Sequence, residues 1–159
     1  MKVLVSYFSA TGNTRSVAQK LAKLADADLY EIKPEVLYTA ADLDWHDANS
    51  RSSIEMHDKK FRPTLADKDA KIADYDVILV GFPIWWYVAP TIINTFLESY
   101  DFSGKTVILF ATSGGSDWGK TLEELKPSVS ESVIMKEGKV FRGRASQTLV
   151  EEWWKTVKY

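Results

Sequence analysis

The N-terminal stretch Met1–Thr14 constrains the fold more than any other part of the chain. It begins as a short apolar strand and runs directly into Ser9–Thr14, an uncharged loop of small, hydroxyl and amide residues. After the loop, apolar residues recur at helical spacing at Val17, Ala18, Leu21 and Leu24. The first backbone N–H groups of a helix lack partners within it and together form a favourable site for an anion. The stretch therefore predicts a strand, a phosphate-binding loop and a helix, although an ordinary Gly-Asn turn that caps a helix is the simpler alternative.

Composition limits the classes of function. The chain has 159 residues, of which 45% are hydrophobic, and this suits a single domain over residues 1–159 with a full-sized core. Its net charge of −2 provides no basic surface, so we expect binding neither to nucleic acid nor to a membrane. The absence of cysteine excludes disulfides, thiolate catalysis and cysteine-based metal sites. Because no apolar run is long enough to span a bilayer, we expect a cytoplasmic protein.

Four further stretches have the pattern of β-strands. Continuous apolar runs at residues 75–82 and 106–111 are typical of central parallel strands that are covered on both faces. Shorter strands are expected at residues 28–32 and 133–135. With the N-terminal strand, they make five.

Helix-like stretches alternate with these strands. Helices are expected after Pro90, over residues 120–125 and at the C-terminus through Trp153, with a hairpin-like turn at Glu137–Gly138. Strands that alternate with helices predict an α/β fold with a three-layer, doubly wound parallel sheet.

Residues 35–75 are the least regular part of the chain. Short helical pieces are expected at 39–45, 50–60 and 65–73. A connection of this length between two strands suggests a crossover helix together with an irregular insertion around residues 35–70.

Three loops follow strands that are expected to lie side by side: residues 9–14, 83–89 and 112–118. In a doubly wound sheet, ligands bind beyond the carboxyl ends of the strands, so the three loops share one rim. The first loop suits a phosphate, the second is rich in Trp and Tyr, and the third is rich in Gly and hydroxyl residues. Together they match a ligand with a phosphate tail and a flat polar ring, such as flavin mononucleotide (FMN).

The chain resembles the flavodoxin family. Most of the family's N-terminal signature is present at the family's spacing, as Val5, Tyr7, Ser9, Gly12, Thr14, Ala18 and Leu21. Ser6 departs from the usual apolar residue. The resemblance implies a five-stranded sheet in the order 2-1-3-4-5, a non-covalently bound FMN, and electron transfer through that flavin. It covers most of the chain apart from residues 35–70.

The resemblance also implies which residues contact the FMN. The phosphate would be held, without a cationic partner, by Ser9, Thr11, Gly12, Asn13 and Thr14. The isoalloxazine ring would be bordered by Pro83, Ile84, Trp85, Trp86 and Tyr87. Its other edge would lie against Thr112, Ser113, Gly114 and Gly115. We expect Trp85 to stack on the ring and no side chain to act as a nucleophile or essential acid, since the flavin carries the chemistry. Alternatively, the aromatic residues plug the sheet edge or an oligomer interface.

Two departures distinguish this chain from the single-electron carriers of the family, and one loop leaves an enzymatic alternative open. Carriers of single electrons commonly have a glycine after the third strand, and residues 83–89 contain none. Such carriers are also strongly acidic, whereas this chain is nearly balanced. The Pro-Ile-Trp-Trp pattern is similar to the corresponding loop of flavodoxin-fold quinone reductases. The partners would therefore be redox proteins for a carrier, or NAD(P)H and a small flat acceptor for a reductase, in a monomer or homodimer.

A third possibility is a nucleotide hydrolase, because Gly114–Thr121 fits the spacing of a nucleotide-triphosphate loop. Asp117 would bring negative charge towards the phosphates, and Trp118 would crowd the loop. No later apolar strand ends in an aspartate that could hold a metal ion. The glycines serve better for close approach to a flavin ring.

Residues 42–62 contain two further groups of polar side chains. Asp42, Asp44, His46 and Asp47, with His57 nearby, superficially suggest a metal site, but an acidic helix start in solvent explains them more simply. A second group could contact a substrate above the flavin or pair with those acidic residues, and it consists of Arg51, Glu55 and Arg62.

Overall fold

The computed structural model describes residues 1–159, and its centre is a five-stranded parallel sheet in the order β2-β1-β3-β4-β5. The strands are β1 (Val3–Tyr7), β2 (Asp28–Glu31), β3 (Val77–Pro83), β4 (Thr106–Ser113) and β5 (Ile134–Arg142). Both the parallel direction and the strand order are those expected from the sequence. The predicted fold class is therefore confirmed.

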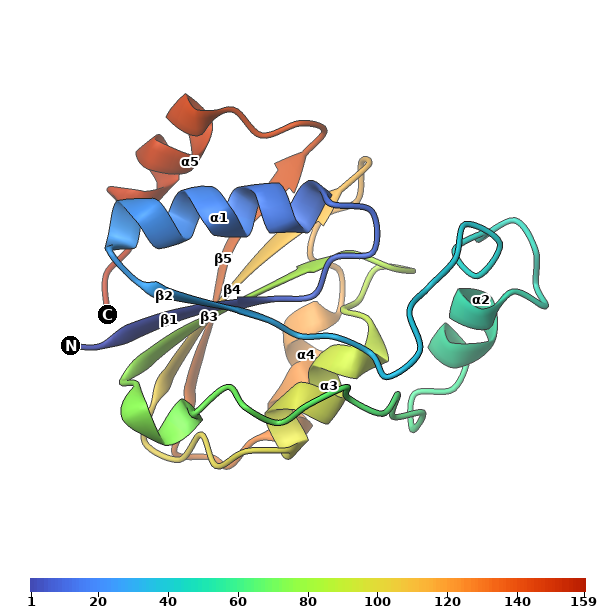
Figure 1. Cartoon of the computed structure of the whole chain (residues 1–159), viewed down its shortest axis with the longest axis horizontal. Helices are drawn as coiled ribbons and strands as arrows, with labels where there is room; N and C mark the ends of the chain where they lie inside the picture. The colour runs from blue at the N-terminus through green and yellow to red at the C-terminus, as the bar shows by residue number, and fades with distance from the viewer.

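Helices cover both faces of the sheet (Figure 1). On one face lie α1 (Asn13–Ala25) and α5 (Gln147–Trp154), and on the other lie α3 (Thr91–Glu98) and α4 (Thr121–Leu125). Two apolar clusters fill the space between the layers, with 14 buried residues on the side of α1 and 22 on the side of α3. The central strands read as continuous apolar runs because both of their faces are buried. None of the helices is both long and apolar enough to cross a membrane.

Strand β5 corrects one expectation. The hairpin-like turn predicted at Glu137–Gly138 is wrong, since the strand continues through it to Arg142. Leu109 of β4 pairs with Glu137 and the next residue, Phe110, pairs with Lys139, so Gly138 is the extra residue of a β-bulge. A Cβ atom on Gly138 would lie 2.4 Å from both the Leu109 carbonyl oxygen and the Trp153 ring. Gly138 is thus required by the close approach of β5 to its neighbours. In the sequence, the same glycine suggests a turn.

The connection from β2 to β3 also differs from expectation. Only α2 (Arg51–Met56) and the short 3₁₀ helix η1 (Ile72–Asp74) form, and the helices predicted at 39–45 and 65–73 are wrong. Residues near 65 instead pair with the chain leaving β2: the Ala66 N–H donates to the Lys33 carbonyl. These cross-chain hydrogen bonds satisfy the backbone without a helix.

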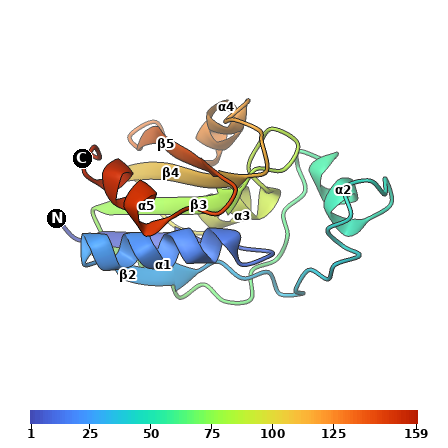
Figure 2. The same cartoon turned by 90° about the horizontal axis from the view of Figure 1, so that it is seen from above.

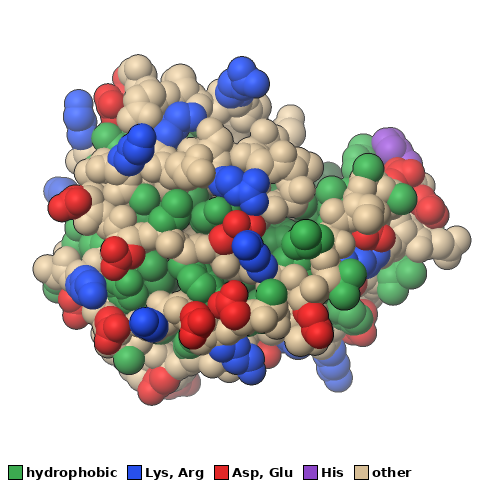
Figure 3. Space-filling model, viewed as in Figure 1, with side chains coloured by type: hydrophobic (Ala, Val, Ile, Leu, Met, Phe, Trp, Pro, Cys, Tyr) green, Lys and Arg blue, Asp and Glu red, His purple; other side chains and the backbone are tan.

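The same connection contains no crossover helix against the sheet. Residues 35–70 are called the insertion below. The part of the insertion around α2 extends past the carboxyl ends of the strands (Figures 1 and 2). Figure 3 shows acidic side chains and a histidine at its outer end. The insertion therefore stands beside the rim where the three polar and aromatic loops emerge.

Candidate functional site

The three loops after β1, β3 and β4 meet at one cavity of about 820 Å³. This volume lies within the range of small-molecule sites, which is roughly 300–1,000 Å³. Ten of the fourteen residues that the sequence singled out line it: Thr11, Thr14, Pro83, Ile84, Trp85, Trp86, Tyr87, Ser113, Gly114 and Gly115. The other four, Ser9, Gly12, Asn13 and Thr112, do not line the cavity.

The loop after β1 ends in a helix start with free donors. Gly12 has φ +99°, a left-handed conformation that favours glycine, and its N–H donates to the Ser9 Oγ over 3.0 Å. Ser9 and Gly12 therefore shape the turn. The backbone N–H groups of Asn13, Thr14 and Arg15 have no hydrogen-bond partner in the protein. With no acidic residue in the first turn of α1, these unpaired donors would favour an anion beside them.

The cation nearest to this loop in sequence is engaged elsewhere. The Arg15 guanidinium donates to Glu31 over 3.0 Å and to the Tyr7 hydroxyl over 3.4 Å. The hydrogen bond to Tyr7, followed by that to Glu31, raises the pKa of Arg15, while burial raises the pKa of Tyr7. The loop thus offers N–H groups and hydroxyls to an anion, rather than a free guanidinium.

A buried pair of hydroxyls fixes the first and third loops to each other. The Oγ1 atoms of Thr14 and Thr112 lie 2.7 Å apart, and both residues are buried. Thr14 lines the cavity, whereas Thr112 lies behind it. Thr112 therefore holds the Thr14 side chain in place from behind the cavity wall.

The loop after β3 is a tight turn with unusual backbone. Trp85 and Val88 exchange two hydrogen bonds, of 2.9 and 3.2 Å, around Trp86 and Tyr87. Both central residues are left-handed, with φ +50° and +65°. Such a turn normally takes Gly or Asn, and bulky residues in this conformation are strained. Strain of this kind concentrates at functional sites.

The loop after β4 supports this turn from the other side. The Lys120 N–H donates to the Tyr87 carbonyl over 3.1 Å. Gly119, with φ +54°, lies so close that a Cβ atom there would be 2.3 Å from the same carbonyl oxygen. The close contact with Gly119 and Lys120 therefore holds the strained turn in place.

The three aromatic side chains of the turn have different environments. Trp85 is half-buried and packs edge-to-face against Phe8 and Tyr38, with ring centroids 5.6 and 5.5 Å away. Trp86 and His57 pack edge-to-face, with ring centroids 5.8 Å apart. Tyr87 is 66% exposed. Trp85 is consequently a fixed wall of the cavity, while Tyr87 stands at its mouth.

Five cavity residues are absent from the sequence-based prediction. Ala10 and Ser116 belong to the predicted loops, while the insertion contributes Leu43, Trp45 and Ser52. Trp45 is a large aromatic residue in a mostly polar stretch, and this is the one sequence signal that could have identified it. The Ser52 hydroxyl is buried and has no hydrogen-bond partner. No pattern in the sequence distinguishes Ser52 from its neighbours.

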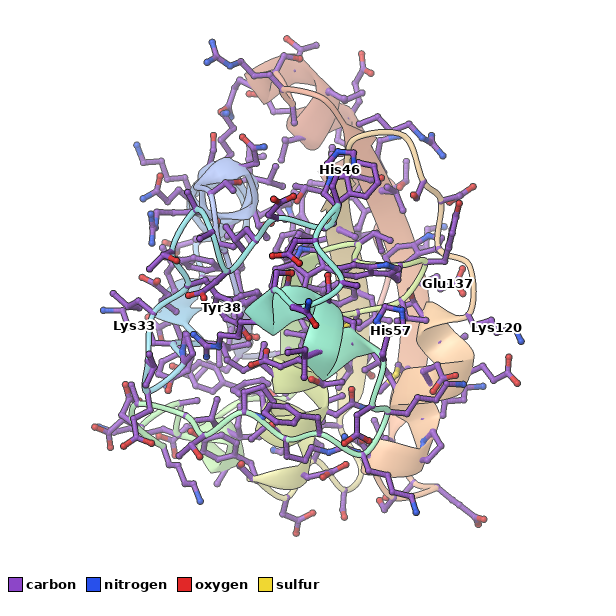
Figure 4. The ribbon with its side chains drawn as sticks, turned by 90° about the vertical axis from the view of Figure 1, so that its right-hand side faces the viewer. Lys33, Tyr38, His46, His57, Lys120 and Glu137 are labelled. Atoms are coloured by element: carbon purple, nitrogen blue, oxygen red, sulfur yellow. The ribbon has the colours of Figure 1, made fainter.

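The insertion is anchored by a buried carboxylate. Glu55 is 4% exposed, accepts a hydrogen bond from the Tyr38 hydroxyl and pairs with Arg51 at 2.9 Å. The Arg51 guanidinium also lies 3.8 Å from the Tyr38 ring centroid. Burial, and then the hydrogen bond to Glu55, raise the pKa of Tyr38. Since Tyr38 packs on Trp85, this anchor also supports the cavity wall. Figure 4 shows Tyr38 beside α2.

Of the two alternatives for the arginines, pairing with the acidic cluster is wrong. Arg51 pairs with Glu55, and Arg62 pairs with Glu98. Asp42, Asp44 and Asp47 accept hydrogen bonds from local backbone N–H groups instead. No group of three or more acidic, histidine or cysteine side chains is placed to hold a metal ion.

The geometry of Gly114–Thr121 does not suit a nucleotide triphosphate. The Thr121 hydroxyl is buried and donates to the Trp118 carbonyl over 2.6 Å. The helix that follows carries Glu123 and Glu124 in its first turn, which disfavours phosphate there.

A family model described as Flavodoxin matches residues 2–157. Among solved structures, a candidate flavoprotein from Bacteroides uniformis is 50% identical with a TM-score of 0.87, and covers 97% of each chain. A second from Bacteroides eggerthii is 46% identical with a TM-score of 0.89, and covers 99% of each chain.

A flavoprotein from Lactobacillus acidophilus in complex with FMN is 24% identical with a TM-score of 0.67, covering 96% of this chain and 98% of that one. A similarity at this level of sequence identity shows a shared fold alone. A comparison with curated proteins gave no match.

Proposed function

The chain belongs to the flavodoxin family, and on this basis we propose that it binds FMN non-covalently and transfers electrons through it. One observation carries the proposal: a single cavity joins an anion site at the start of α1 to an aromatic wall after β3 and an open glycine loop after β4. A phosphorylated flat ring is the ligand that uses all three.

The residues present fit the two ends of FMN. The hydroxyls of Thr11 and Thr14 line the cavity. With the unpaired N–H groups of Asn13, Thr14 and Arg15 beside it, they would hold the phosphate. Trp85 would face the ring. A Cβ atom added at Gly114 or Gly115 would have no other atom within 4 Å, so the backbone of this loop borders open space.

The chemistry of the lining supports a cofactor-based function. Tyr87 is the only cavity residue with an ionisable side chain, so the cavity supplies no carboxylate, imidazole or amine for acid–base work. Bound FMN would supply the acceptance and release of electrons. The protein's residues would hold it and exclude water from the cavity.

The relatives support this cofactor. The two most similar structures described above come from candidate flavoproteins, and the more distant one contains FMN. Two aromatic residues at the cavity mouth, Trp45 and Tyr87, are each 66% exposed. Exposed aromatic side chains beside the cofactor suit contact with a redox partner protein.

A reductase that takes hydride from NAD(P)H and passes electrons to a quinone or similar flat acceptor is the second candidate. The insertion favours it, because Leu43 and Trp45 extend the apolar wall of the cavity beyond the three loops. A flat acceptor would find an aromatic surface there.

Anaerobic mixing of FMN-loaded protein with NADPH separates the two candidates. For a carrier we expect the flavin absorbance to persist until a separate reductase is added, while photoreduction bleaches it. Rapid bleaching by NADPH alone would contradict the carrier and identify a reductase. Colourless protein that ignores FMN and hydrolyses ATP would contradict both.

A further inference from the structure

The insertion has three buried serines at the start of α2, and their hydroxyls are satisfied to different degrees. Ser50, Ser52 and Ser53 are 5%, 2% and 1% exposed. The Ser50 hydroxyl donates to the Ser53 Oγ over 2.8 Å, so these two side chains satisfy each other. The Ser52 Oγ has no partner, and it is the only buried side-chain nitrogen or oxygen atom of the protein without one. Folded proteins rarely retain such an atom, because leaving it unpaired is destabilising.

The fold of the insertion does not depend on this hydroxyl. The Ser52 N–H donates to the Asp42 carbonyl over 2.9 Å, which ties α2 to the chain before it. The neighbouring Arg51 guanidinium donates to Glu55 and to the backbone carbonyl of Val36. None of these hydrogen bonds involves the Ser52 side chain. Its position is therefore fixed while its hydroxyl is unused.

Ser52 lines the proposed flavin cavity, whereas Ser50 and Ser53 do not. The unpartnered hydroxyl thus belongs to the one serine of the three that borders the ligand site. The oxygen itself has almost no exposed surface. A serine hydroxyl, however, has three staggered positions about a single torsion, so a ligand that fills the cavity can draw it into contact.

The hydroxyl suits an uncharged polar group. A serine side chain can both donate and accept a hydrogen bond. The unpaired N–H groups that favour an anion lie at the start of α1, which is a different element. The cation next to Ser52 in sequence, Arg51, is already paired with Glu55 over 2.9 Å. The carbonyl, ring nitrogen and hydroxyl groups of a flavin are neutral partners of the kind that Ser52 can bind.

We propose that Ser52 donates or accepts a hydrogen bond at a neutral polar group of the flavin, on its ring or its sugar-alcohol chain, and not at the phosphate. This rests on the proposed function, because it assigns a contact within the flavin cavity. It gives the insertion a direct part in ligand recognition, beyond the support that Tyr38 gives to Trp85. It also explains the unpartnered hydroxyl, since the ligand supplies the partner that the protein lacks.

Fluorescence titration with FMN and with riboflavin, which carries no phosphate, tests the contact in Ser52→Ala. Loss of one hydrogen bond should weaken the binding of both flavins by the same factor, about two- to tenfold. Ser53→Ala is the matched control, because it removes an equally buried hydroxyl of α2 that does not line the cavity. We expect this control to bind both flavins like the unmodified protein.

Urea denaturation of the flavin-free variants gives a second readout. Ser53→Ala should lower the midpoint, because it removes the partner of the Ser50 hydroxyl. Ser52→Ala should not lower it, because its hydroxyl has no partner to lose. A midpoint that falls as far in Ser52→Ala as in Ser53→Ala would mean that the hydroxyl serves the fold, which contradicts the proposal.

The titrations distinguish failure of this proposal from failure of the proposed function. Equal affinity of Ser52→Ala and the unmodified protein for both flavins would overturn this proposal alone. A loss confined to FMN would also overturn it, since the hydroxyl would then contact the phosphate. If the unmodified protein binds neither flavin, the proposed function falls and this proposal falls with it.

Discussion

At the scale of single residues, the site depends on backbone conformations that most residues avoid. Gly12 turns the chain into α1, and Trp86 and Tyr87 occupy left-handed positions that normally take Gly or Asn. The absence of glycine from residues 83–89 led us to expect a loop unlike that of single-electron carriers. The structure shows that the loop adopts a glycine-type turn with aromatic residues. Sequence patterns carry no signal for such strain, because it is imposed by the surrounding contacts.

Replacing Trp85 tests the proposed stacking. Trp85→Ala should weaken FMN binding by about 1 kcal/mol or more, since it removes an aromatic wall of the cavity. Trp154→Ala, on α5, removes a ring that does not line the cavity and should leave FMN affinity unchanged. Quenching of FMN fluorescence on binding measures both. If Trp85→Ala binds FMN like the unmodified protein, that ring only packs against Phe8 and Tyr38.

Replacing Gly119 tests the contact between the second and third loops. Gly119→Ala adds a Cβ atom 2.3 Å from the Tyr87 carbonyl oxygen to a left-handed residue. Gly104→Ala is the matched control, because Gly104 has φ +75° with nothing within 4 Å. We expect the control to lower the free energy of unfolding by about 1–2 kcal/mol, from backbone strain alone. Gly119→Ala should cost more in urea denaturation and should also weaken FMN binding. Equal losses would show that the loops adjust freely.

At the scale of elements, the regular parts of the fold were predictable and the irregular parts were not. The buried strands β3 and β4 are predicted by their continuous apolar runs. Helix α1 is predicted by the helical spacing of apolar residues after a polar loop. The insertion has no such periodicity, because its order comes from side-chain contacts between residues far apart in sequence, such as Tyr38 with Glu55. For the same reason Trp45 and Ser52 escaped prediction as cavity residues.

Removing the buried Glu55 carboxylate, which anchors the insertion, should lower the stability of the protein. Glu55→Gln weakens the interactions of a buried carboxylate with Arg51 and Tyr38, and we expect the free energy of unfolding to fall by about 1–3 kcal/mol. Glu98→Gln removes a more exposed carboxylate from its arginine and should cost less than about 1 kcal/mol. Denaturant titration at neutral pH compares them. Equal costs would mean that Glu55 gains nothing from its burial.

The second ion pair of this element should depend on pH. The hydrogen bond from Arg62, assisted by Ser128, lowers the pKa of Glu98 below its ordinary value. A carboxyl group whose pKa is lower in the folded than in the unfolded protein stabilises the fold at pH values above its pKa in the unfolded protein. This stabilisation is lost as the pH falls through its pKa in the folded protein. The stability difference between the unmodified protein and Glu98→Gln should therefore be present at pH 7 and shrink below about pH 4. A difference that grows on acidification would contradict this assignment.

At the scale of the whole molecule, the sheet order brings the ends of β1, β3 and β4 together, and the site follows from that placement. The sequence predicted this rim because parallel strands end on one side of the sheet. It could not predict that the insertion would close one side of the rim. Ligand binding at such a rim should stabilise the folded chain by mass action, by roughly 2.7 kcal/mol at a hundredfold excess over Kd.

The central claim is that one cavity holds a phosphorylated ring through N–H groups and hydroxyls at the start of α1. Parallel fluorescence titrations of FMN-free protein with FMN and with riboflavin, which lacks the phosphate, test it most directly. We predict one FMN per chain, bound at least about tenfold more tightly than riboflavin, a difference of about 1.4 kcal/mol. Equal affinity for the two flavins, or binding of neither, would contradict the account.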